Sequence, residues 1–524
     1  MSTPPRTVAP TVAPTVAPSV DPTATTFDEL VIGAGMAGLT VAALLAADGR
    51  RVLVCEAHDT PGGYAHTFGV GAYRFCAQVH YIFGCGEGET IHQVLRRLDL
   101  ADEVRFHRLD PEGFDHVVVA GDRYRIPNGL EKFRDRLIHR HPEAATPLRG
   151  YFDAVQAIGR ELDRLPPRLG LRELATAPLR FPHLLRYRTW TLQRLYDRLR
   201  MPRRLQAVLA GQAGDYLLPP AEVALLLHVA LVRGYDRGAY YPERHFQHLV
   251  GSLAERIATR PGCAMLLSTP IEKVLVQGDR VTGVRARDGR VFTARRYVSN
   301  VDPRRTAQMI EPARLPAAWA RRLDYRYSGG NLTLYLGVAG LDLRAHGFGA
   351  HNVWHYPHDD LNAIYRRQEA LDLDDPWLFM STPTLHTDAP GLCPPGHQIL
   401  ELATSAPHAH FRALRDRDRR RYNLEKKRLR DRLLTIVEER YVPGLRAHLQ
   451  MMVMGTPATN ERFCGAPAGN AYGAALTPAH VGPGRVAQDT PFANLWLANA
   501  TAGYPSVAGT VRAGLDLYRR LAAA

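Results

Sequence analysis

One glycine-rich turn constrains the fold of this chain more than any other feature. The stretch FDELVI, from Phe27 to Ile32, has the pattern of a short strand, and GAGMAG follows it at once. LTVAALLAADG then has the composition of a helix closed by Gly49, and RVLVCE, ending at Glu56, has that of a second strand. A strand, a glycine-rich turn, a helix and a second strand within about thirty residues form a dinucleotide-binding β-α-β unit.

The spacing of the glycines predicts a separate structural role for each one. Gly33 allows the tight turn, Gly35 lets a pyrophosphate approach the backbone, and Gly38 lets helix and strand pack closely. Glu56 lies 18 residues after Gly38, where its carboxylate can accept hydrogen bonds from a ribose diol and would repel a 2′-phosphate. The turn therefore predicts cofactor contacts at Gly33, Gly35, Met36, Ala37, Gly38 and Glu56.

A second glycine pair, Gly62 and Gly63, follows Glu56 after a short spacer. The stretch GGYAHTF resembles the GG motif of two-dinucleotide-binding-domain flavoproteins, where the backbone approaches the cofactor. GGYAHTFGVGAYRF…VHYIFG, which ends at Gly84, resembles the FAD-dependent phytoene desaturase, carotenoid isomerase and retinol saturase family. Within that family it is most similar to the retinol saturase and carotenoid isomerase branch. The resemblance implies that FAD is the cofactor and that it is contacted by Gly62, Gly63, His66 and Thr67.

The resemblance continues to the C-terminus. The segment STPIEKVLVQGDRVTGVRARDGRVFTARRYVSNVDP is similar to the family's second cofactor-contacting strand, and places Val274 at the cofactor. LWLANATAGYPSVAGT, from Leu495 to Thr510, reads as a strand, a tight turn and a helix start, and occupies the place of the closing flavin motif. It implies contacts along the flavin half of FAD from Asn499, Ala500, Ser506 and Val507.

These segments predict an α/β fold with a discontinuous nucleotide domain. A Rossmann-type FAD-binding domain is expected from residues 27–100, 240–310 and 485–524, with an inserted mixed α+β substrate domain from 101–239 and 311–484. Residues 271–294 alternate apolar and polar side chains around QGD and RDG turns, as a β-meander does. The repeated TVAP unit in residues 1–26 places Pro at every fourth position, which favours a disordered tail.

The resemblance implies an FAD-dependent oxidoreductase acting on CH–CH groups of a long hydrophobic polyene. A carotenoid-like or retinoid-like lipid or a polyene acyl chain would be desaturated, isomerised or saturated, as in carotenoid or polyene biosynthesis. Flavin performs the redox step, so few catalytic side chains are needed. The groups expected near the reacting carbons are His80, Tyr81 and Tyr504, for which structural packing is the alternative role.

Two other functions stay open. A flavin amine oxidase shares the N-terminal motif and the fold, but the closing motif offers only one aromatic residue for the cage of such a site. A prenyl-binding or other lipid-binding chaperone of the GDP-dissociation-inhibitor type shares the fold without flavin, and the intact glycines of the first turn argue against it. The histidine pairs HAH and HFQH lack the spacing of a metal site, so no metal is expected.

The net charge and the cysteine content indicate which partners and which cellular location to expect. The net charge is +14, yet no nucleic-acid-binding motif is present, so no nucleic-acid partner is expected. Six cysteines without a C-x-x-C pair indicate a cytoplasmic protein. Residues 160–204 hold 12 Arg against 4 acidic residues, interleaved with Leu, Phe, Tyr and Trp. This pattern predicts peripheral contact with the inner face of the membrane, and a solvated helix pair is the equal alternative.

Overall fold

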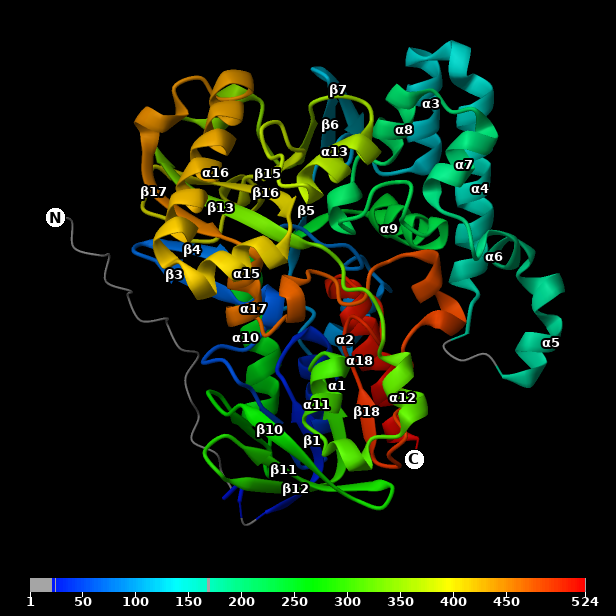
Figure 1. Cartoon of the computed structure of the whole chain (residues 1–524), viewed down its shortest axis with the longest axis vertical. Coiled ribbons are helices and arrows are strands. Elements are labelled where there is room, and N and C mark those ends of the chain that lie inside the picture. The colour runs from blue at the N-terminus through cyan, green and yellow to red at the C-terminus, as the bar shows by residue number, and fades with distance from the viewer. Residues whose placement is uncertain (1–20, 24, 167–169, 524) are drawn as a thin grey trace.

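The computed structural model describes residues 21–23, 25–166 and 170–523 of the chain. Most of the predicted tail, residues 1–26, lies outside the described residues, and the first strand, β1, already begins at Thr26. Two seven-stranded sheets organise the chain. One lies in the lower part of Figure 1 and the other in its upper part.

The first sheet has a parallel centre and an antiparallel edge. In spatial order its strands are β10 (Ile271–Gln277), β11 (Arg280–Ala286), β12 (Val291–Ser299), β1 (Thr26–Ile32), β2 (Val52–Cys55) and β9 (Ala264–Leu266), and β12 also pairs with β18 (Leu495–Leu497). The antiparallel pairs β10–β11 and β11–β12 confirm the predicted meander. The central strand β2 is wholly apolar and buried, and five of the seven residues of β1 are buried, as is typical of parallel strands.

The strand register brings four turns to one edge of this sheet. Ile32 of β1 lies opposite Cys55 of β2 and Ser299 of β12, and Ser299 in turn lies opposite Leu497 of β18. Because the carboxyl ends of parallel strands meet at one edge, the turns that follow these four strands open side by side. The two glycine-rich turns at opposite ends of the sequence are thus neighbours in space.

Helix α1 (Met36–Ala47) packs between α18 (Val507–Ala522) and α10 (His245–Ala258). Eleven of its twelve residues are buried, and it is apolar all round, as a core helix must be. A Cβ atom on Gly514 would lie 2.7 Å from the carbonyl oxygen of Ala37, so a glycine lets α18 approach α1 this closely. The C-terminal helix therefore completes the nucleotide-binding layer.

The second sheet is mixed. In spatial order its strands are β17 (Leu449–Gly455), β13 (Gly330–Ala339), β16 (His397–Ala406), β15 (Leu378–Ser381), β14 (Asn352–Tyr356), β6 (Asp115–Val119) and β7 (Asp122–Ile126). Only the β14–β6 pair is parallel among these described strands.

Each face of this sheet has its own neighbours. Alternate side chains of β13 and β16, such as Leu334 and Leu402, belong to the core cluster that also contains Leu433 of α16 (Arg419–Arg440). The opposite face of β13 packs on the hairpin β3 (Thr67–Val70)–β4 (Tyr73–Cys76), where a Cβ on Gly337 would lie 2.3 Å from the ring of Tyr73. The GG segment that leads into this hairpin therefore connects the nucleotide layer to the inner face of the second sheet.

The remaining helices and strands surround these layers. A helical group occupies the right-hand side of Figure 1, and it consists of α3 (Leu130–Arg140), α4 (Ala145–Asp163), α5 (Leu171–Arg180), α6 (Pro182–Tyr187), α7 (Leu192–Leu199), α8 (Arg203–Leu209) and α9 (Leu225–Arg237). The other elements are α2 (Thr90–Arg97), β5 (Phe106–Arg108), β8 (Tyr240–Pro242), α11 (Pro303–Gln308), α12 (Ala317–Arg322), α13 (Leu361–Glu369), α14 (Pro383–His386), α15 (His408–Arg417) and α17 (Pro457–Phe463). The predicted fold class, a Rossmann-type α/β domain with a mixed α+β insertion, is confirmed.

Candidate functional site

The turn after β1 has the geometry that its glycines predict. Gly33 adopts a φ of +95°, which favours glycine, and a Cβ on Gly38 would lie 2.3 Å from the carbonyl oxygen of Gly33. A Cβ on Gly35 would lie 2.5 Å from Oδ1 of Asn300. Helix α1 begins directly after Gly35, so the backbone N–H groups of Met36 and Ala37 belong to its first turn and have no partner within the helix.

Asn300 ties this first turn to the closing segment. Its Oδ1 accepts a hydrogen bond from the backbone N–H of Gly35 at 2.8 Å, and its Nδ2 donates to the carbonyl oxygen of Ala498 at 2.5 Å. Sequence reasoning did not single out Asn300. The available signal was its position in SNVDP, directly after β12, at the edge where the four turns meet.

Glu56 is fixed where β2 ends. Its Oε2 accepts a hydrogen bond from the N–H of Ala34 at 2.6 Å, and its Oε1 accepts one from the N–H of His58 at 2.8 Å. Each carboxylate oxygen can accept a second hydrogen bond, so the group is oriented and still able to bind a diol. Thr269, in the turn after β9, donates its N–H to the carbonyl oxygen of Glu56 at 2.7 Å and so lies at the same edge.

The second glycine pair lies directly against the first turn. Gly62 and Gly63 have φ values of +117° and +58°, and the N–H of Gly62 donates to the carbonyl oxygen of Ala34 at 2.8 Å. Beyond the pair, His66 is buried, which lowers its pKa, and its Nδ1 lies 2.6 Å from the carbonyl oxygen of Gly63. The hydroxyl of Thr67 lies 3.2 Å from Nδ1 of His245. The structure therefore brings His66 next to the glycine turns, while Thr67 contacts α10.

The closing turn is held by its own polar side chains. Asn499 donates through Nδ2 to the carbonyl oxygen of Val301 at 2.9 Å and accepts through Oδ1 from the N–H of Ala502 at 2.9 Å. Ser506 has a φ of +80°, and its hydroxyl caps α18 by accepting from the N–H of Gly509 at 3.0 Å. The residues predicted to contact the cofactor, Asn499, Ala500, Ser506 and Val507, therefore lie in the closing turn and at the start of α18, at the common edge of the sheet.

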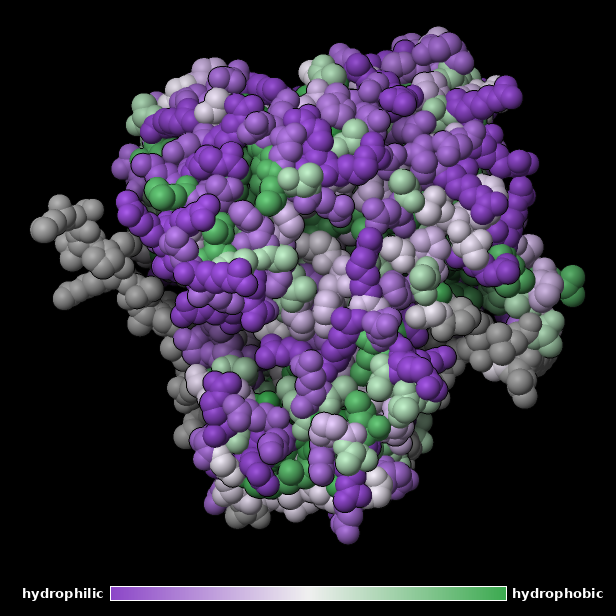
Figure 2. All heavy atoms as spheres, in the orientation of Figure 1, coloured by the Kyte–Doolittle hydropathy of each residue, from purple (hydrophilic) through white to green (hydrophobic). Residues whose placement is uncertain are grey.

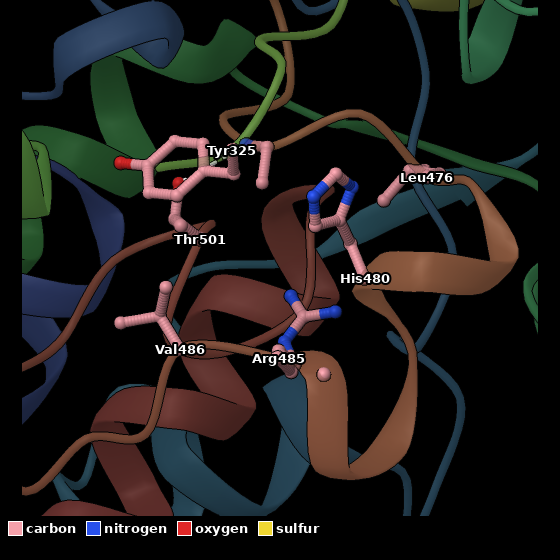
Figure 3. Close-up of a pocket in the computed structure, with 8 residues that line it drawn as sticks. Tyr325, Leu476, His480, Arg485, Val486 and Thr501 are labelled. Carbon is pink, nitrogen blue, oxygen red and sulfur yellow. Dashed lines mark hydrogen bonds between the residues drawn. The ribbon is translucent and has the colours of Figure 1, made fainter. Parts of the chain in front are cut away.

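A small pocket lies beside this turn (Figure 3). Arg485 donates to the carbonyl oxygen of Ala500 at 2.7 Å, and its guanidinium lies 4.5 Å from the ring centre of Tyr504, which is 49% exposed. Burial lowers the pKa of Arg485 to about 10, which keeps it positively charged at neutral pH. In Figure 3 its guanidinium points toward His480, and the pocket is also lined by Thr501. Tyr504 is thus held by Arg485 at the closing turn.

Val274 lies apart from these turns. It belongs to β10, which is separated from β1 by β11 and β12, and its side chain is 3% exposed in a hydrophobic cluster. Its backbone N–H donates to the carbonyl oxygen of Met309 at 2.9 Å. A cofactor contact at Val274 stays a prediction, and the geometry of the meander does not support it.

His80 lies against the inner face of the second sheet. Its Nδ1 is 2.6 Å from Oε2 of Glu401, a residue of β16 that is 1% exposed, and its ring centre is 5.1 Å from that of Phe379. Both Nε2 of His80 and Oε1 of Glu401 are buried without a hydrogen-bond partner. A histidine with one nitrogen fixed by a carboxylate and the other unpartnered can hold or accept a proton at a defined atom. Sequence reasoning predicted His80 but missed Glu401.

Tyr81, the next residue, points to a different set of groups. Its hydroxyl lies 2.9 Å from Oδ2 of Asp115 and 2.8 Å from Oδ2 of Asp215, and its ring stacks on Tyr235 at 4.6 Å between ring centres. Burial raises the pKa of Tyr81 well above its usual value, so its hydroxyl stays protonated. His80 and Tyr81 therefore serve separate polar networks although they are adjacent in sequence.

The histidine pairs of the sequence do not form a metal site within the described part of the chain. No group of three or more His, Cys, Asp or Glu side chains converges there in a way that could hold an ion. His408 instead lies 3.3 Å from Glu461, and His248 contacts the carbonyl oxygen of Glu103 at 3.1 Å.

Known proteins share both the sequence pattern and the fold. The model of a family described as flavin containing amine oxidoreductase matches residues 36–429, which is more than half of the chain. The all-trans-retinol 13,14-reductase of Danio rerio is 24% identical over 85% of this chain and 77% of its own length. The phytoene desaturase (lycopene-forming) of Pseudescherichia vulneris is 27% identical over 93% of this chain and 98% of its own length.

Solved structures with the same fold include an oxidoreductase from Methanosarcina mazei and a putrescine oxidase. The first has a TM-score of 0.62 at 17% identity, over 94% of this chain and 99% of its own. The second has a TM-score of 0.64 at 16% identity, over 95% of this chain and 100% of its own. At these identities the likeness concerns the fold alone.

The residues present fit the flavin that this family implies. The two touching glycine turns form a cradle that any Cβ would fill, the first turn of α1 offers free N–H groups, and Glu56 is oriented at the end of β2. The resemblance predicted from the glycine motifs is confirmed, and the chain is a flavin-dependent oxidoreductase. The chain therefore belongs to the flavin-containing amine oxidoreductase family.

Proposed function

We propose that this protein uses FAD to desaturate, isomerise or saturate carbon–carbon double bonds of a long hydrophobic polyene. The observation that carries the proposal is similarity along most of the chain to proteins named for such reactions. Besides the reductase and the desaturase, prolycopene isomerase 1 of Oncidium hybrid cultivar is 23% identical over 86% of this chain and 76% of its own length. All three names concern double bonds of a polyene, so the type of reacting bond is shared. Because the three reactions differ, similarity does not decide whether this chain desaturates, isomerises or saturates the bond.

FAD, rather than a mononucleotide, suits the predicted binding residues. Glu56 lies beside the first glycine turn, where an adenosine ribose would need an acceptor, and the closing turn supplies Asn499 and Ser506 for the opposite half. A cofactor that extends from Glu56 to the start of α18 would need both halves of a dinucleotide. When bound, the flavin accepts or supplies the two electrons that the reaction needs.

Aromatic side chains of the second sheet favour an apolar substrate. Phe68 and Phe75 of the β3–β4 hairpin pack on Tyr335 of β13, with ring centres 5.1 and 5.2 Å away. Phe379 of β15 packs both on His80 and on Trp354 of β14, whose ring centre is 4.6 Å away. An inner face of this kind can hold a long unsaturated chain by apolar contact, with few polar groups to orient it.

In this proposal His80 lies near the reacting carbons. Glu401 holds Nδ1, so Nε2 is the atom that can take up or release a proton. Tyr504 stays a prediction, because its hydroxyl belongs to the closing turn and its ring is held by Arg485. An amine substrate is the alternative, and the putrescine oxidase likeness supports the fold without supporting that substrate.

Peripheral membrane contact would suit an enzyme that takes its substrate from a bilayer. Helices α5 and α6 project from the right edge of Figure 1, Leu179 of α5 is 88% exposed, and Figure 2 has apolar atoms at that edge. Arg180 and Arg186 are exposed on the same helices. Within the described residues, none of the helices combines the length and the apolar character needed to cross a membrane. We propose a cytoplasmic protein that docks on the inner membrane face through residues 160–204.

Two measurements test the proposed function in turn. The purified chain should be yellow, and heat or acid should release FAD, which chromatography separates from FMN. The flavoprotein is then mixed without oxygen with phytoene, prolycopene and all-trans-retinol. Bleaching of the flavin marks a desaturase substrate, and a shifted polyene spectrum without net redox change marks an isomerase. Oxidation of dithionite-reduced flavin by a polyene marks saturation. A colourless protein, or one inert to every polyene while amines bleach it, would contradict the proposal.

A further inference from the structure

Three side chains from distant parts of the sequence form a chain of hydrogen bonds, in which Tyr81 and Asp115 are buried. Asp215 lies in the short helix Ala213–Asp215, Tyr81 follows the β3–β4 hairpin, and Asp115 begins β6. The Tyr81 hydroxyl lies 2.8 Å from Oδ2 of Asp215 and 2.9 Å from Oδ2 of Asp115. A phenol has one proton to donate, so it can serve only one of the two carboxyl groups as a donor.

The surrounding donors decide which carboxyl group is charged. Asp115 also accepts a hydrogen bond from Nε2 of Gln212 at 2.8 Å and one from Nδ2 of Asn352 at 3.1 Å. These donors solvate a carboxylate at Asp115, which therefore accepts the Tyr81 proton as well. The oxygen of Tyr81 is then free to accept, and a protonated Asp215 donates to it. Proton positions follow from this donor and acceptor count.

Within the described part of the chain, no cationic side chain is among the groups that act on Asp215. The titratable groups facing it are the acid Asp115 and the phenols Tyr81, Tyr216, Tyr235, Tyr356, Tyr365 and Tyr472. Burial raises the pKa of Asp115 to about 7, and burial together with the charge of Asp115 raises the pKa of Asp215 well above its usual value. Two carboxyl groups this close in an apolar setting cannot both ionise near neutral pH.

Asp215 is also connected to the cofactor-binding turns. The Tyr472 hydroxyl lies 3.5 Å from the carbonyl oxygen of Gly214, and a Cβ on Gly473 would lie 2.3 Å from the hydroxyl of Thr501 in the closing turn. Tyr64, which follows the GG pair, donates to the carbonyl oxygen of Asn470 in the same segment. The segment 470–473 therefore joins both flavin-binding turns to the residue beside Asp215. Asp215 itself is partly exposed, whereas Asp115 is fully buried.

We propose that Asp215 is the acid that exchanges a proton with the substrate, and that Tyr81 and Asp115 keep it protonated. The inference rests on the proposed polyene chemistry. Adding hydrogen across a double bond needs two electrons and two protons, and hydride transfer accounts for both electrons and one proton. The second proton comes from Asp215: its O–H bond breaks, a C–H bond forms, and a carboxylate remains. Tyr81 then turns its proton toward that carboxylate, and water restores the acid. The step assigned to Asp215 is therefore that of saturation, since desaturation would need a carboxylate at this position.

Infrared spectroscopy of the full flavoprotein tests the protonation state without turnover. At a pH well above the pKa of Asp115, which is about 7, the wild type should show the C=O stretch of a protonated carboxyl group, with a shift in D₂O, and Asp215→Asn should lose it. In Asp115→Asn the like charge is gone and Tyr81 can donate to Asp215, so the band should disappear at a lower pH than in the wild type. A band that survives in Asp215→Asn at a pH well above the pKa of Asp115, which is about 7, or a band whose pH range is unchanged in Asp115→Asn, would overturn the assignment.

Turnover with the polyene that the wild type converts tests the transfer itself. Asp215→Asn keeps the shape and the hydrogen bond to Tyr81 but cannot give up a carboxyl proton, so kcat should fall about 10²-fold with flavin content and KM retained. Asp215→Glu should restore part of kcat, which a purely structural role would not predict. Wild-type kcat in Asp215→Asn would overturn the proposal.

The two readouts separate this inference from the proposed function. If the wild type converts no polyene, the proposed function and the transfer step both fail, while the infrared band still reports whether Asp215 is a neutral acid. If the wild type converts a polyene and Asp215→Asn does so equally well, only the role of Asp215 fails.

Discussion

Oδ1 of Asn300 accepts a hydrogen bond from the backbone N–H of Gly35 at 2.8 Å, across 265 residues of sequence. The other end of the same amide donates to Ala498, so one side chain links the first and the closing turns. The predicted cofactor site is therefore a single structure made from both ends of the chain. Its stability and its affinity for flavin should depend together on this amide.

Asn300→Ala should lower both the stability of the protein and its affinity for flavin. The N–H of Gly35 and the carbonyl of Ala498 would lose their partner, and an unsatisfied group of this kind costs about 1–3 kcal/mol. We expect a lower thermal unfolding midpoint and weaker flavin binding, measured by scanning calorimetry and by flavin fluorescence on dilution. Asn300→Asp retains Oδ1, but adds a negative charge where phosphates should bind, so it should lose flavin more than Asn300→Ala does. Full flavin retention in Asn300→Asp would contradict this placement.

Gly35→Ala should abolish flavin binding or nearly so. Its Cβ would lie 2.5 Å from Oδ1 of Asn300, so the turn would have to open at the place where the pyrophosphate should lie. The flavin-to-protein absorbance ratio of the purified variant measures the effect. Gly251→Ala is the matched control, because Gly251 lies inside α10 and its Cβ would have no atom within 4 Å. That control should keep its flavin and gain stability of up to about 1 kcal/mol from helix propensity.

Glu401→Gln should slow turnover and leave flavin content unchanged. A glutamine amide can donate to Nδ1 of His80, which would move the imidazole proton to Nε2 and remove the acceptor there. We expect kcat to fall by about 10²-fold with the polyene found to react. Tyr73→Phe is a suitable control, since it removes a hydroxyl bound to His397 on the neighbouring hairpin. Equal kcat in Glu401→Gln and Tyr73→Phe would exclude a role for the His80–Glu401 pair.

Buried histidines should make the fold sensitive to acid. Burial lowers the pKa of His228 to about 3 and that of His386 to about 4, from 6.5. Between the folded and the unfolded pKa, the unfolded chain binds more protons, so stability falls as pH drops from about 6.5, at up to about 1.4 kcal/mol per pH unit for each histidine. Buried Asp115, whose pKa is raised to about 7, acts in the opposite direction.

The contribution of one histidine can be isolated by substitution. Nε2 of His228 lies 2.7 Å from the hydroxyl of Tyr151, and its Nδ1 lies 3.3 Å from that of Tyr216. Glutamine can keep one such bond and does not titrate. We expect the acid unfolding midpoint of His228→Gln to lie at a lower pH than that of the wild type, as measured by circular dichroism between pH 3 and pH 8. An unchanged midpoint would show that His228 is not protonated on unfolding.

Charge reversal should separate membrane docking from general basicity. Arg186→Glu with Arg188→Glu, in and just after α6, should prevent sedimentation with anionic vesicles at low salt, and the wild type should be released as salt rises. Arg420→Glu with Arg421→Glu makes the same charge change on exposed positions of α16 and should leave binding intact. If both pairs weaken binding equally, net charge alone accounts for it.

Local patterns were sufficient to predict the nucleotide layer. The turns at Gly33, Gly62 and Ser506, the meander and the carboxylate of Glu56 each depend on residues close together in sequence. Asn300, Glu401 and Asp215 were missed because each acts on a residue far away in the chain, at separations of 265, 321 and 134 positions. A single polar residue of this kind produces no periodic pattern or fixed spacing in the sequence. Its partner is determined by how the layers pack in the folded chain.

Val274 shows that a local pattern can predict a strand without predicting its place in the sheet. The strand that carries it was predicted from its alternation, but alternation does not say whether a strand lies at the centre or the edge of a sheet. The structure puts β10 at the outer edge of the first sheet, two strands away from β1. Only the pairing of strands, which is a property of the whole chain, decides which strand ends reach the cofactor.

The position of α18 has a consequence for how the protein matures in the cell. Its packing on α1, with Gly514 against Ala37, adds the last wall of the nucleotide site. A ribosome releases the N-terminal glycine turns hundreds of residues before it makes β18 and α18. Because the closing turn and α18 supply one half of the predicted site, that site is complete only after these residues have been synthesised. Until then the apolar surface of α1 lacks one of its covering helices and is a natural target for chaperones.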